Sequence, residues 1–490
     1  MNSWIRWNDK PVPAEPSWRW LAASLGMPAL LATPPRPLAE LKPAASRLKE
    51  PIRQKLVALL GEDRVRQDKE ARLQHAGNST VSQMRLRAGQ TSHIPDAVLY
   101  PRHENEVLAL LRICADGDAA ATPFGGGRNV TPERNGHASA VTINMSGLDH
   151  IVSIDGLSGL ARVEAGISTL ELTRQLALRG LCFAPQRFGT VGGAIAQGEN
   201  SESVRDVRVA TPKGLLPSGF LPLMRGSRGS LGVITGATLR VHAAPARRHH
   251  VRYLFPDFAS GLVALRAMQR CGLINGTAHV EAHLSDADET RFRQWLDNRL
   301  DRPSLWQRLD GIYRQLRQID DKAAALTLTF SGQDTEIEYA RKQFSALTRE
   351  LGALIRDAVP SQDVSLDTLL LDHGAAAGRL DATASWAGLP RLYVAVRGTL
   401  DRAMRAHAPR PGAHGAVLCS VIHVCHDGAD LRFTYVYPRT LKDDAAQALA
   451  IRQAGLAAIA AHAPPPGELG TELKRAIKQL LDPRAILNPG

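Results

Sequence analysis

Three glycine-bearing segments follow one another in a fixed order along this chain. They are residues 123–130 (PFGGGRNV), 189–193 (GTVGG) and 226–235 (GSRGSLGVIT). Each lies beside a predicted strand or helix start, where bare backbone N–H groups can point at a phosphate. Glycine is needed at such places because a Cβ atom would block the close approach of an anionic ligand. One segment is weak evidence, but three in one stretch predict a pocket that closes around a long dinucleotide.

The length and composition of the chain exclude several classes of protein. With 490 residues, the chain is long enough for two or more domains. No apolar run approaches the roughly 20 residues of a membrane-spanning helix, and the N-terminus lacks the apolar core of a secretion signal. The five cysteines are scattered and odd in number, which favours a reducing compartment. We therefore expect a cytoplasmic protein without a transmembrane segment.

The formal net charge of +12 indicates an anionic partner. Because the basic residues are spread along the chain, this excess is better suited to attracting a small anionic ligand than to binding nucleic acid. We expect a small anionic substrate and no nucleic-acid partner. The sequence carries no signal for the oligomeric state.

The chain divides into four regions by composition and predicted structure. Residues 1–92 are proline-rich at first and then helical, and residues 93–245 alternate strand and helix. Residues 246–440 read as a separate α+β domain, with His249 and His250 expected on the surface where the chain crosses into it. Residues 441–490 are mostly helical.

Apolar periodicity gives the expected elements of the two central regions. A helix at 168–179 begins with the capping pair Ser168 and Glu171. Two further helices are expected at 104–115 and 258–271. The expected strands are 97–100, 120–124, 140–144, 151–154, 161–165, 251–255 and 325–330.

Several of these stretches together resemble a known family. Residues 95–101 (PDAVLYP), the Gly125–Gly127 loop, 163–167 (VEAGI) and the two later glycine segments are similar to the PCMH-type FAD-binding domain of the vanillyl-alcohol-oxidase class. The likeness continues into 284–290 and 481–490. Within that class the chain resembles FAD-linked oxidases related to alkyldihydroxyacetonephosphate synthase and to D-lactate and glycolate dehydrogenases.

The resemblance implies an α+β fold and an FAD cofactor. It places a two-subdomain FAD-binding domain at 93–245, a substrate or cap domain at 246–440, and helical segments at 1–92 and 441–490. The first glycine loop would cradle the pyrophosphate, the second would line the flavin channel, and the third would support the adenosine half. The implied cofactor-binding residues are Pro123, Phe124, Gly125, Gly126, Gly127, Arg128, Asn129, Val130, Thr190, Val191, Gly192, Gly193, Gly226, Ser227, Gly232, Val233 and Ile234.

The catalytic positions depart from the family pattern. The family's triple histidine near the C-terminus is absent, and His462 stands alone there. His283 occupies the position of the family's arginine, and Arg432 that of its tyrosine. His423 is a candidate base. A metal shared by His423 and His426 is disfavoured, because residues three apart on a strand face opposite sides. The candidate catalytic residues are therefore His283, His423 and Arg432, with no metal.

Three functions remain open. The first is an FAD-dependent oxidoreductase that passes hydride from a small 2-hydroxy-acid-like anion to the flavin, with Arg432 holding the carboxylate. The second is alkyl transfer of the ether-lipid type, without net redox change. The third is a non-catalytic or flavin-degenerate accessory homologue, which the missing histidines and a shortened flavin loop favour.

Overall fold

The computed structural model describes residues 15–77, 79–127, 136–183, 189–198, 203–274, 279–296, 322–350, 354–357, 366–462 and 468–488. By their contacts the residues form two compact units. The first unit comprises residues 1–34 and 245–465, and the second comprises residues 35–244 and 466–490. Each unit takes in an early and a late part of the chain, so the segments 1–92 and 441–490 are each divided between the two. The four-part division along the chain stays a prediction.

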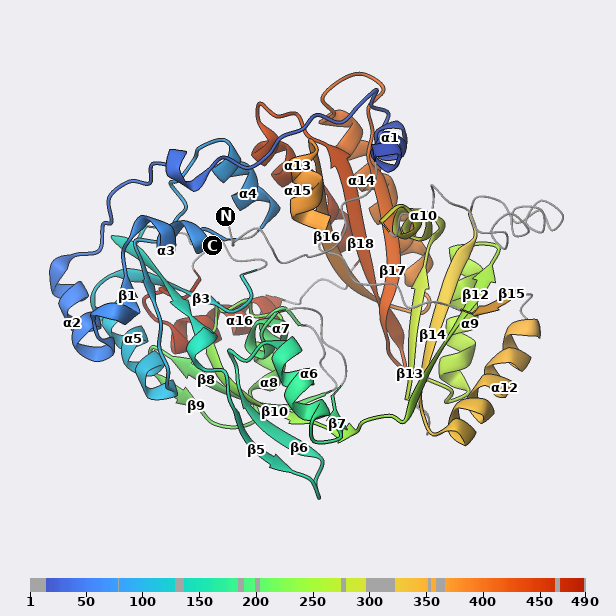
Figure 1. Ribbon diagram of the computed structural model, residues 1–490, viewed down its shortest axis with the longest axis horizontal. Coiled ribbons are helices and arrows are strands. Elements are labelled where there is room, and N and C mark those ends of the chain that lie inside the picture. Colours follow the sequence, from blue (N-terminus) through green and yellow to red (C-terminus); the bar gives the residue numbers. More distant parts are fainter. Residues whose placement is uncertain are drawn as a thin grey trace. The chain divides into compact units, whose positions relative to one another are not determined.

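A four-stranded sheet of order β1-β2-β4-β3 opens the second unit (Figure 1). Strands β2, β4 and β3 are parallel, because helix α5 (Glu104–Asp116) carries the chain back between β2 and β3. The expected strands and helix of this region lie within one residue of the observed bounds. The strands are β1 (Val65–Arg66), β2 (Ala97–Leu99), β3 (Ala119–Phe124) and β4 (Ser139–Asn144).

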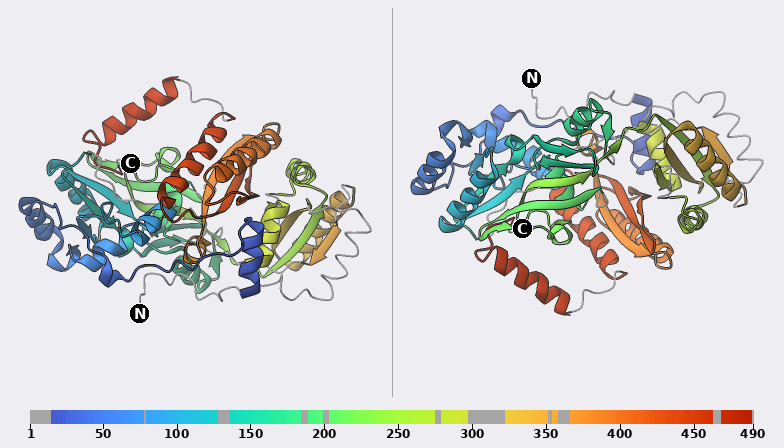
Figure 2. Two further views of the ribbon diagram at one scale, coloured as in Figure 1. Left: turned by 90° about the horizontal axis from the view of Figure 1, so that it is seen from above. Right: turned by 90° about the horizontal axis from the view of Figure 1, so that it is seen from below.

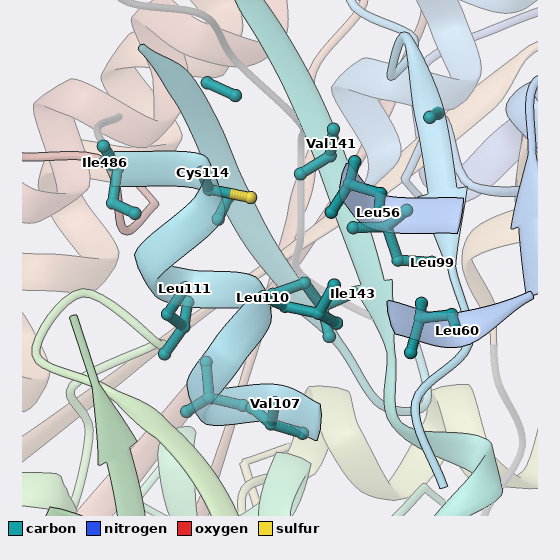
Figure 3. Packing of buried hydrophobic residues seen from close by; sticks show 14 of the residues in the cluster. Leu56, Leu60, Leu99, Val107, Leu110, Leu111, Cys114, Val141, Ile143 and Ile486 are labelled. Atoms are coloured by element: carbon teal, nitrogen blue, oxygen red, sulfur yellow. The ribbon is translucent and has the colours of Figure 1, made fainter. Parts of the chain in front are cut away.

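Helix α5 and helix α2 (Glu50–Leu60) share an apolar core with this sheet (Figure 3). Alternate residues of β2 and β4 point into it, as the pleat of a strand requires. The side chains labelled in Figure 3 are Leu56, Leu60, Leu99, Val107, Leu110, Leu111, Cys114, Val141, Ile143 and Ile486. Ile486, which lies near the end of the chain, therefore belongs to the same core as the early strands.

A five-stranded antiparallel sheet of order β5-β6-β10-β8-β9 completes the second unit. Helices α6, α7 and α8 contribute side chains to its core. The expected cap of α6 is confirmed, because Ser168 Oγ accepts a hydrogen bond from the Glu171 N–H at 3.1 Å. The bounds are β5 (Ile151–Asp155), β6 (Leu160–Glu164), β8 (Val204–Thr211), β9 (Gly214–Leu216), β10 (Val233–Arg240), α6 (Thr169–Ala177), α7 (Val191–Ala196) and α8 (Leu221–Met224).

The end of the chain returns to the second unit after helix α16 (Glu468–Leu481) (Figure 2). There Leu487 forms a parallel bridge with Ala121 on β3, the edge strand of the four-stranded sheet. The remaining elements of this unit are α3 (Lys69–Gln74), α4 (Thr80–Arg87), β7 (Leu181–Cys182), β11 (His242–Ala243) and the short 3-10 turns Leu38–Glu40, Glu62–Arg64 and Met145–Gly147.

The first unit is built on a seven-stranded antiparallel sheet of order β15-β12-β14-β13-β17-β18-β16. The expected strands 251–255 and 325–330 lie within β12 and β14. The strands are β12 (Arg247–Phe255), β13 (His279–Ser285), β14 (Ala324–Gly332), β15 (Leu354–Asp357), β16 (Ala375–Ser385), β17 (Ala416–Val424) and β18 (Gly428–Pro438).

Helices pack on both faces of this sheet. Leu418 and Val436 point toward Trp18 and Trp295, which come from α1 and α10. On the other face, α14 and α15 cover β16 and β18, where Gly455 lies against Leu380. The helices are α1 (Glu15–Ser24), α9 (Phe258–Arg270), α10 (Ala287–Leu296), α12 (Asp334–Glu350), α13 (Leu366–Asp372), α14 (Leu389–Ala406) and α15 (Asp444–Ala460).

One local expectation for this unit is wrong. His249 and His250 are not surface residues of a crossing but lie half-buried in β12, paired with Phe330 and Thr329 of β14. The strand starts four residues earlier than expected because its partner β14 is long enough to pair with all of it. The α+β class is confirmed. No helix in the described part of the chain is long and apolar enough to cross a membrane.

Candidate functional site

The first and second glycine segments meet in the second unit. A Cβ atom on Gly125 would overlap the Oγ1 of Thr190, and one on Gly126 would stand 3.0 Å from the Cα of Gly189. The first contact leaves no room for a side chain, and the second would force the facing backbone to shift. Segments that lie more than sixty residues apart in the sequence therefore touch through their backbones, as the dinucleotide prediction requires.

The third glycine segment joins the other two. A Cβ on Gly229 would lie 2.7 Å from the Cγ of Pro123, the residue two before Gly125. The N–H of Gly226 donates to the carbonyl of Ile195 at 3.3 Å, and that of Arg228 donates to Ala196 at 2.9 Å. Because Ile195 and Ala196 end helix α7, the third segment lies against both the end of β3 and the helix that follows the second segment.

Local interactions fix the shape of the second segment. Thr190 caps helix α7, and its Oγ1 accepts a hydrogen bond from the Gly193 N–H at 3.2 Å. The Gly192 N–H donates to the carbonyl of Ala165 at 2.8 Å, and a Cβ on Gly192 would lie 2.8 Å from the Cβ of Ala165. The second segment is therefore held to 163–167, one of the other stretches that carry the family resemblance.

The first segment offers unoccupied donors. The N–H groups of Gly125, Gly126 and Gly127 donate to no described residue. Gly127 has a φ of +69°, a left-handed conformation that turns the chain sharply at little cost only in glycine. A run of free N–H groups in a side-chain-free loop suits the oxygens of a pyrophosphate. The residues present therefore fit a phosphate-bearing cofactor.

The other predicted cofactor residues differ in how they could contribute. Val191, Val233 and Ile234 are buried with their side chains in hydrophobic cores, so only their backbone groups are available to a ligand. Gly232 is likewise enclosed, against Val209. Arg128, Asn129 and Val130 lie outside the described residues.

A histidine that the sequence did not single out lies beside the first segment. The ring of His75, just after α3, lies 4.5 Å from that of Phe124. Its Nδ1 donates to the carbonyl of Ala71 at 2.7 Å, so its Nε2 accepts from the amide of Asn144 at 2.8 Å. Burial lowers the pKa of His75. No motif marks this residue, because it comes from a segment that the sequence showed only as helical.

The three predicted catalytic residues share one face of the seven-stranded sheet in the first unit. Ser285, Ser420 and Arg432 are directly opposite one another on β13, β17 and β18, so they point to the same side. His283 precedes Ser285 by two residues and shares that side. His423 joins them because a bulge in β17 pairs it with Asp430, two residues from Arg432.

Each of these side chains has a partner within the protein. His283 Nε2 lies 3.4 Å from Nη2 of Arg293, and His423 Nδ1 lies 3.8 Å from an oxygen of Asp430. Arg432 makes two parallel hydrogen bonds to Asp381, Nε to Oδ1 at 2.7 Å and Nη2 to Oδ2 at 2.8 Å. The bidentate contact predicted for a substrate carboxylate is therefore occupied by the protein's own carboxylate, because Asp381 and Arg432 are cross-strand partners.

A buried ionic cluster in the first unit also escaped sequence reasoning. Asp286, 2% exposed, accepts from Arg397 and from the Tyr393 hydroxyl, and Arg397 also pairs with Asp288 at 2.6 Å. Burial raises the pKa of Asp286 to about 7, against the opposing effect of Arg397. Asp286 also caps α10 through the Glu289 N–H at 2.8 Å. The sequence signal was the 284–290 stretch, but nothing in it revealed the partner on α14.

The described residues contain one group able to share a cation, formed by Asp149, His150 and Glu164 in the second unit. Asp149 and His150 are exposed and Glu164 is half-buried. It includes neither His423 nor His426.

Two stretches of the chain match known protein families. Residues 95–216, which contain the first two glycine segments, match the family described as FAD binding domain. Residues 465–490 match the C-terminal domain of FAD linked oxidases. The chain is thus a flavoprotein that carries the FAD-binding and C-terminal domains of the FAD-linked oxidases, with FAD as its cofactor.

Two groups of proteins resemble the chain over different lengths. The alkyldihydroxyacetonephosphate synthase of Dictyostelium discoideum is 25% identical over 425 residues, 79% of this chain and 68% of that protein. The mitochondrial D-lactate dehydrogenase (cytochrome) of Arabidopsis thaliana is 29% identical over 177 residues, 31% of each chain.

Solved structures show the same fold. A structure of alkyldihydroxyacetonephosphate synthase superimposes with a TM-score of 0.78 at 22% identity, covering 96% of this chain and 92% of that one. The 4-ethylphenol oxidase of Gulosibacter chungangensis gives a TM-score of 0.66 at 13% identity, over 93% and 98%. The chain has the fold of the PCMH-type flavoproteins, as the sequence predicted.

Proposed function

We propose that this protein is an FAD-dependent enzyme whose reaction is of the alkyldihydroxyacetonephosphate synthase type, an exchange of groups on a small phosphorylated substrate without net oxidation. One observation carries the proposal. The likeness to that synthase spans 79% of the chain and so includes much of the first unit, whereas the likeness to D-lactate dehydrogenase spans only 31%. Because substrate specificity resides outside a shared cofactor domain, the longer likeness bears more on the reaction.

The glycine segments bind the cofactor in this proposal. Free N–H groups of Gly125, Gly126 and Gly127 hold phosphate oxygens, and Thr190 fixes the facing segment. When bound, the flavin ring supplies an electron sink that can accept an electron pair and return it. The net charge of +12 attracts a substrate that carries phosphate.

Proton transfer is assigned to the face of the seven-stranded sheet that carries His283, His423 and Arg432. His283 is the first candidate, and Nη2 of Arg293, 3.4 Å from its Nε2, would orient the ring. His423, beside Asp430, is the second. These two would take the place of the missing histidine cluster near His462, whose own Nδ1 donates to the carbonyl of Ala458 at 2.9 Å on the exposed side of α15. Arg432, paired with Asp381, orients this face rather than holding substrate.

Oxidation of a 2-hydroxy acid is the second candidate function. It is supported by the 29% identity to D-lactate dehydrogenase, which exceeds the 25% identity to the synthase. The pairing of the Arg432 guanidinium with Asp381 counts against this function, because a 2-hydroxy acid needs a cation for its carboxylate.

One pair of assays separates these functions. The FAD-loaded protein is first mixed under argon with D-lactate, glycolate and a panel of other 2-hydroxy acids, and flavin bleaching at 450 nm is recorded. It is then incubated with acyl dihydroxyacetone phosphate and a long-chain alcohol, and ether product is measured by mass spectrometry. We expect ether product without bleaching. Bleaching by a hydroxy acid would establish the second function, and neither signal from a fully loaded protein would establish the accessory role.

A further inference from the structure

The end of the chain extends the four-stranded sheet of the flavin-binding unit. The Ala121 N–H donates to the carbonyl of Ile486 at 2.7 Å, and the Asn488 N–H donates to the carbonyl of Ala121 at 3.0 Å. Ala121 lies on β3, the edge strand that leads directly into the first glycine segment. The C-terminal residues therefore cover the free edge of the strand that positions Gly125.

An ion pair with a buried carboxylate shapes this tail. The carboxylate of Asp482, which is 1% exposed, accepts from the N–H groups of Ile486 at 3.1 Å and Leu487 at 2.8 Å. It also accepts from Nζ of Lys478 at 2.6 Å. Lys478 donates in addition to the carbonyl of Leu487 at 3.0 Å. A buried carboxylate with this many donors is fully satisfied, so it holds the tail in one conformation.

The same lysine reaches the third glycine segment. Its Nζ donates to the carbonyl of Ser230 at 2.6 Å, and the side-chain amide of Asn488 donates to the carbonyl of Arg228 at 2.7 Å. Two carbonyls of the third segment, two residues apart, thus accept hydrogen bonds from the C-terminal residues. We call this set of contacts, made by Lys478, Asp482 and Asn488, the C-terminal clamp.

The clamp determines where two N–H groups point. In a planar trans peptide the C=O and the following N–H point in opposite directions. With the carbonyls of Arg228 and Ser230 fixed toward the tail, the N–H groups of Gly229 and Leu231 point away from it. Neither donates to any described residue, and Gly229 is buried against Pro123. A buried N–H without a partner is costly, which indicates a ligand or a bound water at this position.

We propose that the C-terminal clamp positions the flavin site: Lys478 and Asn488 turn the N–H groups of Gly229 and Leu231 toward an anionic part of FAD. The proposal deepens the proposed function and rests on its flavin site. The three clamp residues lie within 465–490, the stretch that matches the C-terminal domain of FAD linked oxidases. The clamp residues are positioning residues, since they act through the backbone of the third segment.

The test measures FAD affinity in the full-length protein. Asn488→Ala removes the contact to Arg228 without leaving a buried charge. Lys478→Met combined with Asp482→Asn removes the contact to Ser230 while avoiding an unpaired carboxylate. Apoprotein of each variant is titrated with FAD, and quenching of flavin fluorescence gives the dissociation constant. We expect an increase of about tenfold for each, the size of one lost hydrogen bond to a charged or oriented group.

Matched controls separate positioning from folding. Lys474→Met changes an exposed lysine on the same helix, and we expect it to leave the dissociation constant unchanged. The thermal midpoint of each apoprotein is recorded beside its affinity. Wild-type affinity in both clamp variants would overturn the proposal. So would a loss of affinity that an equally destabilised Leu176→Ala variant, in the core under α6, reproduces. Failure of the wild-type protein to bind FAD would instead refute the proposed flavin site itself.

Discussion

A Cβ atom on Gly125 would overlap the Oγ1 of Thr190, the residue that caps helix α7. This relationship joins two glycine segments from different parts of the second unit. It also explains the glycine without reference to any ligand, because the protein's own hydroxyl already fills the space. The flavin site is thus constrained twice, by the cofactor that must approach and by the segment opposite.

Gly125→Ala should abolish flavin retention. The added methyl must displace Thr190, and the displaced cap shifts Gly193 and the start of α7. The measurement is flavin released per protein after heat denaturation. Gly156→Ala is the control, since nothing lies within 4 Å of a Cβ there. We expect the second substitution Thr190→Ala to restore part of the flavin content, and a failure to restore any would show that the methyl excludes the cofactor directly.

Gly126→Val should act on the fold as well as on the cofactor, because even one methyl would stand 3.0 Å from the Cα of Gly189. We therefore expect Gly126→Val to lower both flavin content and the thermal midpoint of the apoprotein. An unchanged midpoint would show that the two backbones can separate at no cost.

Acid should destabilise the second unit through His93. This side chain is 5% exposed, and burial together with the charge of Arg85 lowers its pKa to about 4. In the unfolded chain the His93 imidazole has a pKa near 6.5, so between about pH 6.5 and about pH 4 the unfolded state binds a proton that the folded state does not. The stability of the fold therefore falls as the pH drops from about 6.5 to about 4. Across this window the free energy of unfolding falls by about 3 kcal/mol. Hydrogen exchange of β2 amides across this window should show it, and His93→Phe should flatten the profile while His103→Phe should not.

Arg432→Met and Asp381→Asn should behave alike. If the two side chains serve each other, each variant loses about 1 kcal/mol of stability, because Asp381 is half-exposed, and neither changes the KM of an anionic substrate. If Arg432 instead holds substrate, Asp381→Asn frees the Arg432 guanidinium and lowers the KM of the anionic substrate, while Arg432→Met raises it. Opposite shifts in KM would restore the role that the sequence suggested.

Arg397→Met should destabilise the first unit strongly. It leaves Asp286 buried without its cation, which costs about 3 kcal/mol or more. Burial raises the pKa of Asp286, and removal of Arg397 raises it further, so the variant should lose stability as the pH rises and be most stable in mild acid. The described tryptophans, Trp18, Trp20, Trp295 and Trp386, belong to this unit, so their fluorescence reports its unfolding. The double variant with Asp286→Asn should recover much of the loss and remove the pH dependence.

Local patterns in the sequence determined the elements and the class of cofactor. Strands β2, β3 and β4 and helix α5 were predicted to within a residue, because apolar periodicity and capping act over a few neighbouring residues. The three glycine segments pointed to a phosphate cradle for the same reason: a missing side chain is visible in the sequence wherever it occurs.

Only the tertiary structure decided which side chains meet. His423 would face away from Arg432 in a regular strand, and one extra residue in β17 turns it to the same side. Arg432 was assigned to a substrate, but strand pairing sets Asp381 opposite it. Likewise Lys478 reaches Ser230 across 248 residues of sequence. Register, bulges and long-range contacts are fixed by packing of the whole chain, so short patterns do not encode them.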